Sequence, residues 1–262
     1  MSGAIEDDFE AEEEILFVPK KPSAAAFPSG SAKPSTVAAE RFEVQTLRDA
    51  IDEVAGAMPV QRVVAAPARR ILVVLDLNGL LFFREKIEQT PRGVTSHAQV
   101  GTFNVWDRRH GDSFLDFVFS SFDVGVWSSA RQENVTKLVE RTFGPKRMKS
   151  LVFMWDQSYC TVEKRKPRPL FAKELRKVWE AFPQYDRSNT LLIDDDEEKA
   201  KHNPDYSAIH PKEWTRHLPQ DDKLGPGGVI RRYLETMLDS LRSDGDMTVE
   251  EYVRTHPFEE SD

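Results

Sequence analysis

Short apolar runs recur along the second part of the chain, and segments with helical spacing separate them. The run at 71–75 is continuous and rich in β-branched residues, which is typical of a central strand that a parallel sheet buries on both faces. Similar runs follow at 123–127, 151–155 and 190–193. Strands that alternate with helices predict an α/β fold, a Rossmann-like parallel sheet that is flanked by helices and has right-handed crossovers.

The segments between these runs carry apolar residues at spacings of three and four, which predicts amphipathic helices. The helices are predicted at about 112–121, 131–142, 168–181, 229–241 and 249–255. Residues 82–107 lack the alternation of strand and helix, and we expect them to form an inserted flap or hairpin.

Residues 1–66 differ in pattern from the rest of the chain. An acidic run at 6–14 is followed by a stretch rich in Pro, Ser, Ala and Lys at 19–36. Such a composition cannot offset its ordering entropy by burial, so we predict a mostly disordered tail over 1–66 and a folded domain over 67–262. Apolar residues at helical spacing predict one helix within the tail, at 40–57. A short apolar patch beside the acidic run leaves open a second role for the tail, the docking of a protein partner.

Composition and charge narrow the classes of function. The chain has 44 acidic and 36 basic residues, a formal net charge of −8, and this argues against direct nucleic-acid binding because the phosphate backbone needs a basic surface.

No apolar stretch reaches the length of a membrane span. The single cysteine, Cys160, excludes an internal disulfide framework and fits a reducing compartment. With an acidic N-terminus where a targeting signal would be basic, we expect a nuclear or cytoplasmic protein rather than a mitochondrial one.

Polar residues stand where the predicted strands end. Asp76 follows the first strand, Ser128 follows the second, and Asp194 and Asp195 follow the last. In an open α/β sheet, ligands bind beyond the carboxyl ends of the strands. Carboxylates that meet at this edge repel each other unless a cation lies between them, and Mg²⁺ is the common hard dication with oxygen ligands. The Ser128 hydroxyl and Lys173, on the helix before the last strand, add donors that suit phosphate oxygens.

Each of these residues also has a simple structural explanation. An Asp after a strand commonly forms a turn, and Ser128 can cap the next helix. Lys173 can be a solvated lysine on a helix, and the Asp run at 194–196 can be an exposed acidic turn. The order along the chain, which is Asp, Ser, Lys and paired Asp, favours one shared site over four unrelated roles.

The same positions carry motifs of a known family. Segment 75–81, Leu-Asp-Leu-Asn-Gly-Leu-Leu, resembles the first motif, Asp-x-Asp-x-Thr/Val, of the haloacid dehalogenase-like phosphatases. Segments 108–115, 126–130 and 192–195 are similar to the Arg-Pro-Gly…Phe-Leu segment, the second motif and the fourth motif of one branch. That branch contains the RNA polymerase II C-terminal-domain phosphatases and the nuclear LIM interactor-interacting factors. The resemblance covers about residues 69–255.

The lysine of the third motif has two candidates. Lys173, in Ala-Lys-Glu-Leu, resembles the Lys-Asp-Leu of the family, and Lys166, which precedes Pro167, competes with it. The sequence leaves this choice open.

The resemblance implies a Mg²⁺-dependent phosphatase that acts on a Ser/Thr phosphoprotein through an aspartyl-phosphate at Asp76. The implied Mg²⁺ ligands are Asp76, the main chain of Asn78, Asp194 and Asp195, and the implied phosphate-binding residues are Ser128 and Lys173. Asp194 is expected to support the metal or Lys173.

One departure from the family pattern bears on catalysis. The family's second Asp protonates the leaving alkoxide and then activates water, but this chain has Asn78 there and Leu80 in place of the usual Thr or Val. An amide has no proton to exchange near neutral pH, and general acid–base help is worth about 10²–10⁴ in rate. We therefore expect attenuated activity. The alternative is a catalytically silent binding or scaffold domain, distantly like the phosphatase-like receptor of the mitochondrial inner-membrane translocase.

Overall fold

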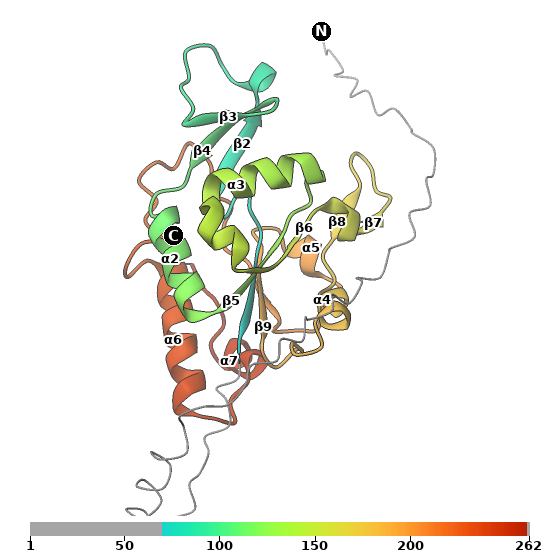
Figure 1. Cartoon of the computed structure of the whole chain (residues 1–262), viewed down its shortest axis with the longest axis vertical. Coiled ribbons are helices and arrows are strands. Elements are labelled where there is room, and N and C mark those ends of the chain that lie inside the picture. Colours follow the sequence, from blue (N-terminus) through green and yellow to red (C-terminus); the bar gives the residue numbers. More distant parts are fainter. Residues whose placement is uncertain (1–69, 261–262) are drawn as a thin grey trace, which may run out of the picture. The chain divides into compact units, whose positions relative to one another are not determined.

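The computed structural model describes residues 70–260, all of which belong to one compact unit, Ala65–Asp262. The predicted tail over 1–66 and its helix at 40–57 lie outside the described residues. The centre of the fold is a five-stranded parallel sheet with the strand order β10-β9-β1-β5-β6 (Figure 1). Its strands are β1 (Leu72–Leu75), β5 (Asp123–Trp127), β6 (Leu151–Trp155), β9 (Thr190–Ile193) and β10 (Ala208–Ile209). The prediction of an α/β fold with a parallel sheet is confirmed.

Strand β1 lies in the middle of the sheet because all four of its residues are apolar and buried. Val73 and Leu75 contribute to the core on one face of the sheet, which contains helices α2 (Gly111–Ser121), α3 (Gln132–Lys149), α6 (Val229–Ser243) and α7 (Val249–Thr255). Leu72 and Val74 contribute to the core on the other face, with α4 (Leu175–Ala181) and the short α5 (Glu197–Ala200). Alternate side chains of one strand thus serve two cores, which explains the unbroken apolar run.

Helix α3 continues beyond its predicted end at 142. Gly144 has a positive φ of 70° and is followed by Pro145, so the helix is interrupted there and a further turn leads to Lys149. The last buried apolar residue of the helix is Phe143, and this is why the sequence pattern fades at that point.

The segment at 82–107 forms the predicted flap. It is a three-stranded antiparallel sheet in the order β2-β4-β3, which extends from one end of the parallel sheet in Figure 1. Its elements are β2 (Phe82–Lys86), the 3₁₀ turn η1 (Ile87–Gln89), β3 (Ala98–Val100) and β4 (Phe103–Asp107).

The predicted helix at 168–181 is wrong over its first part. Strand β8 (Leu170–Ala172) pairs there with β7 (Thr161–Glu163) in an antiparallel hairpin that follows the turn η2 (Gln157–Tyr159), and α4 begins only at Leu175. Pro167 and Pro169 disfavour helical backbone in the residues that precede them. Lys173 therefore lies in the link between β8 and α4 rather than on a helix.

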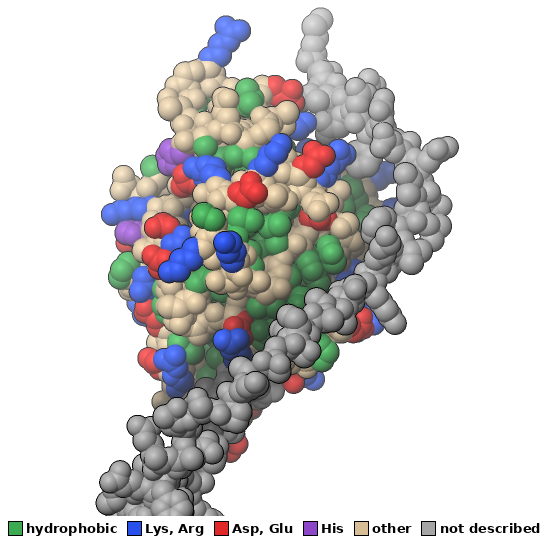
Figure 2. All heavy atoms as spheres, in the orientation of Figure 1, with side chains coloured by type: hydrophobic (Ala, Val, Ile, Leu, Met, Phe, Trp, Pro, Cys, Tyr) green, Lys and Arg blue, Asp and Glu red, His purple; other side chains and the backbone are tan. Residues whose placement is uncertain are grey.

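The surface agrees with the mixed charge of the sequence. Figure 2 shows one face of the molecule, on which basic and acidic side chains are interspersed, so this face has no continuous basic surface. Within 70–260, no helix combines the length and the hydrophobicity that crossing a membrane requires.

Candidate active site

The strand order places the predicted site residues at one edge of the sheet. Strand β1 lies between β5 and β9, with Leu75 opposite both Val126 and Ile193. Asp76 directly follows β1, and its main-chain N–H donates to the Ile193 carbonyl at 2.9 Å. The structure thus brings the ends of the three strands together, as the sequence predicted.

A buried ion-pair network joins the residues that follow strands β1 and β9. The Lys173 ammonium donates to Asp76 Oδ1 at 2.7 Å and to Asp194 Oδ2 at 2.5 Å. Lys173 has no exposed surface, and Asp76 is only 2% exposed. Burial by itself lowers the pKa of Lys173, but the two carboxylates outweigh it and raise the pKa above the usual value for lysine. Lys166, the competing candidate, is exposed in the loop between β7 and β8.

Three carboxylates meet beside this network. Asp76, Asp194 and Asp195 each offer one oxygen, and these oxygens lie within 4.8 Å of one another. The Oδ1 atom of Asp195 is buried and has no hydrogen-bond partner within 70–260; the ammonium of Lys199 lies 3.7 Å away. Burial and the neighbouring Asp76 raise the pKa of Asp195 to about 8. An unpaired buried oxygen in a cluster of carboxylates is what a hard dication relieves, so the donor set fits Mg²⁺.

Gly79 makes room for this approach. It has a positive φ of 84°, and a Cβ at this position would lie 2.2 Å from Asp195 Oδ2. Any other residue would push the Asp195 carboxylate away from the cluster, so the glycine within the first motif has a steric reason.

Asn78 is held by the flap. Its side-chain Oδ1 accepts a hydrogen bond of 3.0 Å from the main-chain N–H of Arg84 on β2. Asn78 and Phe82 also form an isolated β-bridge, which closes the turn between β1 and the flap. The amide lines the same pocket as Asp76, at the position where the resemblance places the general acid.

Ser128 does not cap the next helix, because the N-cap residue of α3 is Arg131. Ser128 is 5% exposed, and its Oγ accepts the N–H of Ala130 at 3.2 Å in a local turn before the helix. Its own N–H donates to the Trp155 carbonyl at 2.9 Å, which fixes the end of β5 against β6. Ser128 lines the pocket of Asp76, so its O–H donor can also turn toward a bound phosphate.

The pocket has a volume of about 460 Å³, and its charge is strongly acidic. Its acidic lining residues within the described chain are Asp76, Asp195, Asp196, Glu197, Glu198 and Glu213, against the two basic residues Arg84 and Lys199. A phosphate dianion would be repelled by this lining unless cations offset it. The geometry therefore suits phosphate only together with a dication and the lysines.

Sequence reasoning missed Lys199, Arg84 and Glu213. The Lys199 ammonium lies 3.2 Å from Asp194 Oδ1 and 3.8 Å from Asp76 Oδ2. A signal for Lys199 existed, because it stands four residues after Asp195, and residues at that spacing share one face of a helix. Arg84 is in the flap and Glu213 in an irregular loop, and the sequence pattern does not place either segment in space.

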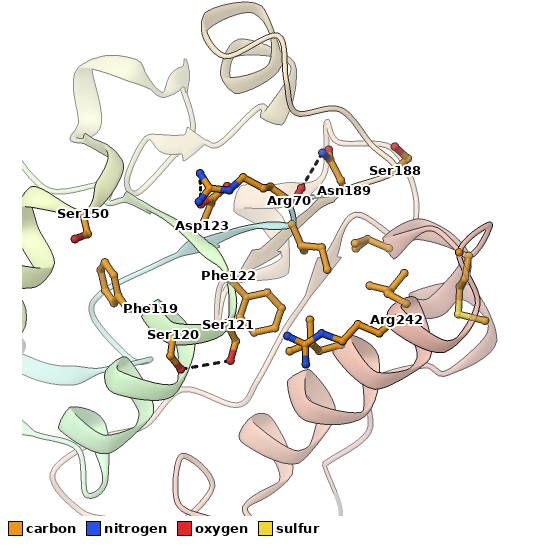
Figure 3. A pocket seen from close by; sticks show the side chains of 16 residues that line it. Arg70, Phe119, Ser120, Ser121, Phe122, Asp123, Ser150, Ser188, Asn189 and Arg242 are labelled. Atoms are coloured by element: carbon orange, nitrogen blue, oxygen red, sulfur yellow. Dashed lines mark hydrogen bonds and ion pairs between the residues drawn. The ribbon is translucent and has the colours of Figure 1, made fainter. Parts of the chain in front are cut away.

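A larger pocket, of about 950 Å³, lies at the opposite, amino end of the strands (Figure 3). Its lining includes Arg70 and Asp123, whose charged groups pair at 3.4 Å, and Arg242. Asp123 also accepts a hydrogen bond from Tyr185 Oη at 2.7 Å, so its carboxylate is fully engaged. None of the predicted site residues lines this pocket.

Replacing Asp195 by Asn is expected to stabilise the metal-free protein by about 1–3 kcal/mol, because it removes the negative charge of a buried carboxyl group that Asp76 and Asp194 repel. Added Mg²⁺ should raise the melting temperature of the wild type but not that of the Asp195→Asn variant. Urea and thermal unfolding, with and without Mg²⁺, measure both changes.

Asp196→Asn is the matched control for this substitution. The Asp196 side chain is 44% exposed and accepts the N–H of Glu198 at 3.1 Å at the start of α5. Its replacement should change stability by less than about 1 kcal/mol and keep the response to Mg²⁺. A metal-free Asp195→Asn protein that is less stable than the wild type would show that the cluster carries no such repulsion.

The sequence of this chain is similar to sequences of known proteins. Residues 71–248 match the family model described as NLI interacting factor-like phosphatase. An uncharacterized FCP1 homology domain-containing protein of Schizosaccharomyces pombe is 26% identical over 184 residues, which cover 65% of this chain and 72% of that protein. A CTD phosphatase-like protein of Invertebrate iridescent virus 3 is also 26% identical over 184 residues, covering 64% of this chain and 97% of its own.

Among solved structures, that of Fcp1, an essential RNA polymerase II CTD phosphatase, aligns with 14% identity and a TM-score of 0.41. The alignment covers 81% of this chain, and this chain spans 60% of the length of that one. The family model alone covers more than half of the sequence. The chain therefore belongs to the NLI interacting factor-like phosphatase family, whose members are FCP1 homology domains with a haloacid dehalogenase-like fold.

Proposed function

We propose that this domain is a slow, Mg²⁺-dependent phosphatase that acts on a phosphoprotein through an aspartyl-phosphate at Asp76. The observation that carries the proposal is the cluster of Asp76, Asp194 and Asp195 within 4.8 Å, with the Lys173 ammonium between the first two. A nucleophile, a cation site and a lysine at one sheet edge are the groups that phosphoryl transfer to a carboxylate requires.

Asp76 acts as the nucleophile. One of its carboxylate oxygens forms a bond to phosphorus while the bond from phosphorus to the leaving oxygen breaks, and water then cleaves the aspartyl-phosphate and restores the carboxylate. The hydrogen bond from Lys173 fixes the orientation of this carboxylate before the substrate arrives. Asp76, the Asn78 carbonyl, Asp194 and Asp195 would hold Mg²⁺, which when bound neutralises charge on the phosphoryl oxygens.

Two further groups hold the phosphoryl group. The Ser128 hydroxyl lines the pocket, and the buried Lys173 ammonium contacts the Asp76 carboxylate that receives the phosphoryl group, so we assign both as donors to phosphoryl oxygens. Asn78 cannot supply a proton to the leaving oxygen, so this proton comes from water. The turnover is slow for that reason, and slowest for alkoxide leaving groups, which need the proton most.

A catalytically silent binding domain is the second candidate, and the character of Asn78 favours it. The amide is tied to the flap through Arg84 N–H and has no exchangeable acid proton. In that case the site would bind a phosphorylated partner without turning it over.

Asp76→Asn separates the two candidates. We expect the wild type to release phosphate from p-nitrophenyl phosphate when Mg²⁺ is present, and the variant to fall to the rate without enzyme. Because the wild-type rate is itself slow, it exceeds the rate without enzyme by a limited factor. We therefore expect Asp76→Asn to lower the rate about 10–100-fold.

Asp205→Asn makes the same change at an exposed position away from the pocket and should keep the wild-type rate. Circular dichroism confirms that each variant is folded. Equal rates for the wild type and Asp76→Asn would end the proposal of a phosphatase.

A further inference from the structure

Arg84 is a cation at the site that the proposed function leaves without a role. It lies on β2, the first strand of the flap, and lines the pocket of Asp76. Its Nη1 atom is buried and has no hydrogen-bond partner in the described part of the chain. Leaving a buried donor unpaired costs free energy, so its placement at a pocket wall points to a ligand.

One ring contact and the register of β2 with β4 position Arg84 at this wall. Its Cζ lies over the ring of Phe103, 4.6 Å from the ring centroid, and β2 pairs with β4 so that Arg84 stands opposite Val105. Burial lowers the pKa of Arg84 and the nearby Asp76 offsets only part of this effect, but arginine stays protonated at any physiological pH. The site therefore contains a fixed positive charge that cannot act as an acid.

The position of Arg84 relative to Asn78 indicates which of the two reacting oxygens, attacking or leaving, it can serve. The main-chain N–H of Arg84 donates to Asn78 Oδ1 at 3.0 Å, so the backbone of this residue lies next to the place of the missing general acid. In phosphoryl transfer the attacking and leaving oxygens are roughly in line. Lys173 contacts Asp76 from the buried interior, whereas Arg84 reaches the pocket from the flap beside Asn78, so we assign Arg84 to the side of the leaving oxygen.

We propose that Arg84 stabilises the negative charge that develops on the leaving oxygen, in place of the proton that Asn78 cannot give. The inference rests on the proposed function and names its substrate class, an aryl phosphate such as a phosphorylated tyrosine side chain. A phenol has a pKa of about 10, so phenolate can depart as an anion beside a guanidinium. The alkoxide of a serine is far more basic and needs a proton, which a guanidinium does not supply.

The reaction balances without a general acid. The Asp76 carboxylate forms an oxygen–phosphorus bond, the phosphorus–phenolate bond breaks, and its electron pair leaves with the phenolate. The phenolate is stabilised by the Arg84 guanidinium until it takes a proton from solvent. Water then attacks phosphorus, the bond from phosphorus to the Asp76 oxygen breaks, and the carboxylate is restored while inorganic phosphate leaves and the proton of the water passes to solvent.

The dependence of rate on the leaving group tests this assignment. Wild type, Arg84→Gln and Arg84→Lys are compared with Mg²⁺ on substituted phenyl phosphates whose phenols range from strongly acidic to weakly acidic. For Arg84→Gln we expect kcat/KM to fall about 100-fold on unsubstituted phenyl phosphate and less than about 3-fold on a dinitrophenyl phosphate, because only the more basic phenolate needs the cation. Arg84→Lys keeps the positive charge. Its kcat/KM on unsubstituted phenyl phosphate should therefore be at least 10-fold higher than that of Arg84→Gln.

Arg92→Gln is the matched control, because Arg92 is an exposed arginine of the same flap and does not line the pocket. It should leave the whole series unchanged. If Arg84→Gln loses the same factor in kcat/KM for every phenol, the inference is overturned, because Arg84 would then act on the phosphoryl group or in folding. If Arg84→Gln loses no activity on any phenol, the inference is also overturned.

The two proposals fail in different ways. If Asp76→Asn lowers the rate and Arg84→Gln does not steepen the leaving-group dependence, only the role of Arg84 is wrong. If the wild type and Asp76→Asn have equal rates on all substrates, the phosphatase proposal and the inference fall together.

Discussion

Replacing Asn78 by Asp should raise the Mg²⁺-dependent turnover of a phosphoserine peptide by about 10²–10⁴-fold, the range that a positioned general acid contributes. An Asp at this position can still accept the N–H of Arg84, which Asn78 Oδ1 accepts at 3.0 Å. Its second oxygen replaces the amide nitrogen with little change in volume. The surrounding carboxylates would raise the pKa of the new carboxyl group, so part of it stays protonated near neutral pH.

The gain should depend on the leaving group. An alkoxide needs the proton in the transition state, whereas a nitrophenolate does not, so we expect an increase below about 10-fold on p-nitrophenyl phosphate. The ratio of kcat/KM for Asn78→Asp and wild type on the two substrates measures this difference. The double variant Asp76→Asn with Asn78→Asp is the control, and it should show no activity above background. An unchanged rate on the phosphoserine peptide would mean that the site lacks more than its acid.

Lys173→Met is expected to destabilise the metal-free protein by about 3–5 kcal/mol, the usual cost of removing one partner from a buried ion pair. The ammonium is the direct hydrogen-bond partner of two buried carboxylates, at 2.7 Å from Asp76 Oδ1 and 2.5 Å from Asp194 Oδ2. Methionine fills a similar volume, so the loss reports on charge rather than on a cavity. Urea unfolding monitored by tryptophan fluorescence measures it.

Two comparisons make this prediction specific. Lys177→Met, on α4, removes a lysine whose ammonium contacts only the Tyr159 carbonyl among its described hydrogen bonds, at 2.9 Å, and should cost less than about 1 kcal/mol. Combining Lys173→Met with Asp194→Asn should recover part of the loss, because one of the two unpaired charges disappears. If Lys173→Met costs no more than Lys177→Met, the network does not stabilise the fold in the way described.

The sequence located the strand ends at which the candidate site residues stand because these strands are buried on both faces. Such strands are continuous apolar runs, so their carboxyl ends at Asp76 and Asp194 are easy to locate. The parallel sheet then brings these ends together. The sequence did not show which strands are neighbours, since the order β10-β9-β1-β5-β6 depends on how the crossovers pack.

The errors and omissions arose in segments with short-range structure. Lys173 was assigned to a helix because the apolar spacing after 168 fits one, but the hairpin of β7 and β8 occupies those positions. Arg84 was missed because the flap contains short antiparallel strands that have no strong periodic pattern. A side chain that reaches a pocket from such a segment becomes visible only when the segment is placed in three dimensions.

Lys199 has a consequence for how a dication and a phosphate group affect each other's binding. With Lys173 it gives the three clustered carboxylates two ammonium partners, so this cluster is close to electroneutral before anything binds, although the pocket wall around it is acidic. A dication arriving alone would make it positive, and a phosphate arriving alone would make it strongly negative. Each ligand should therefore bind more tightly when the other is present, and by linkage the two enhancements are equal.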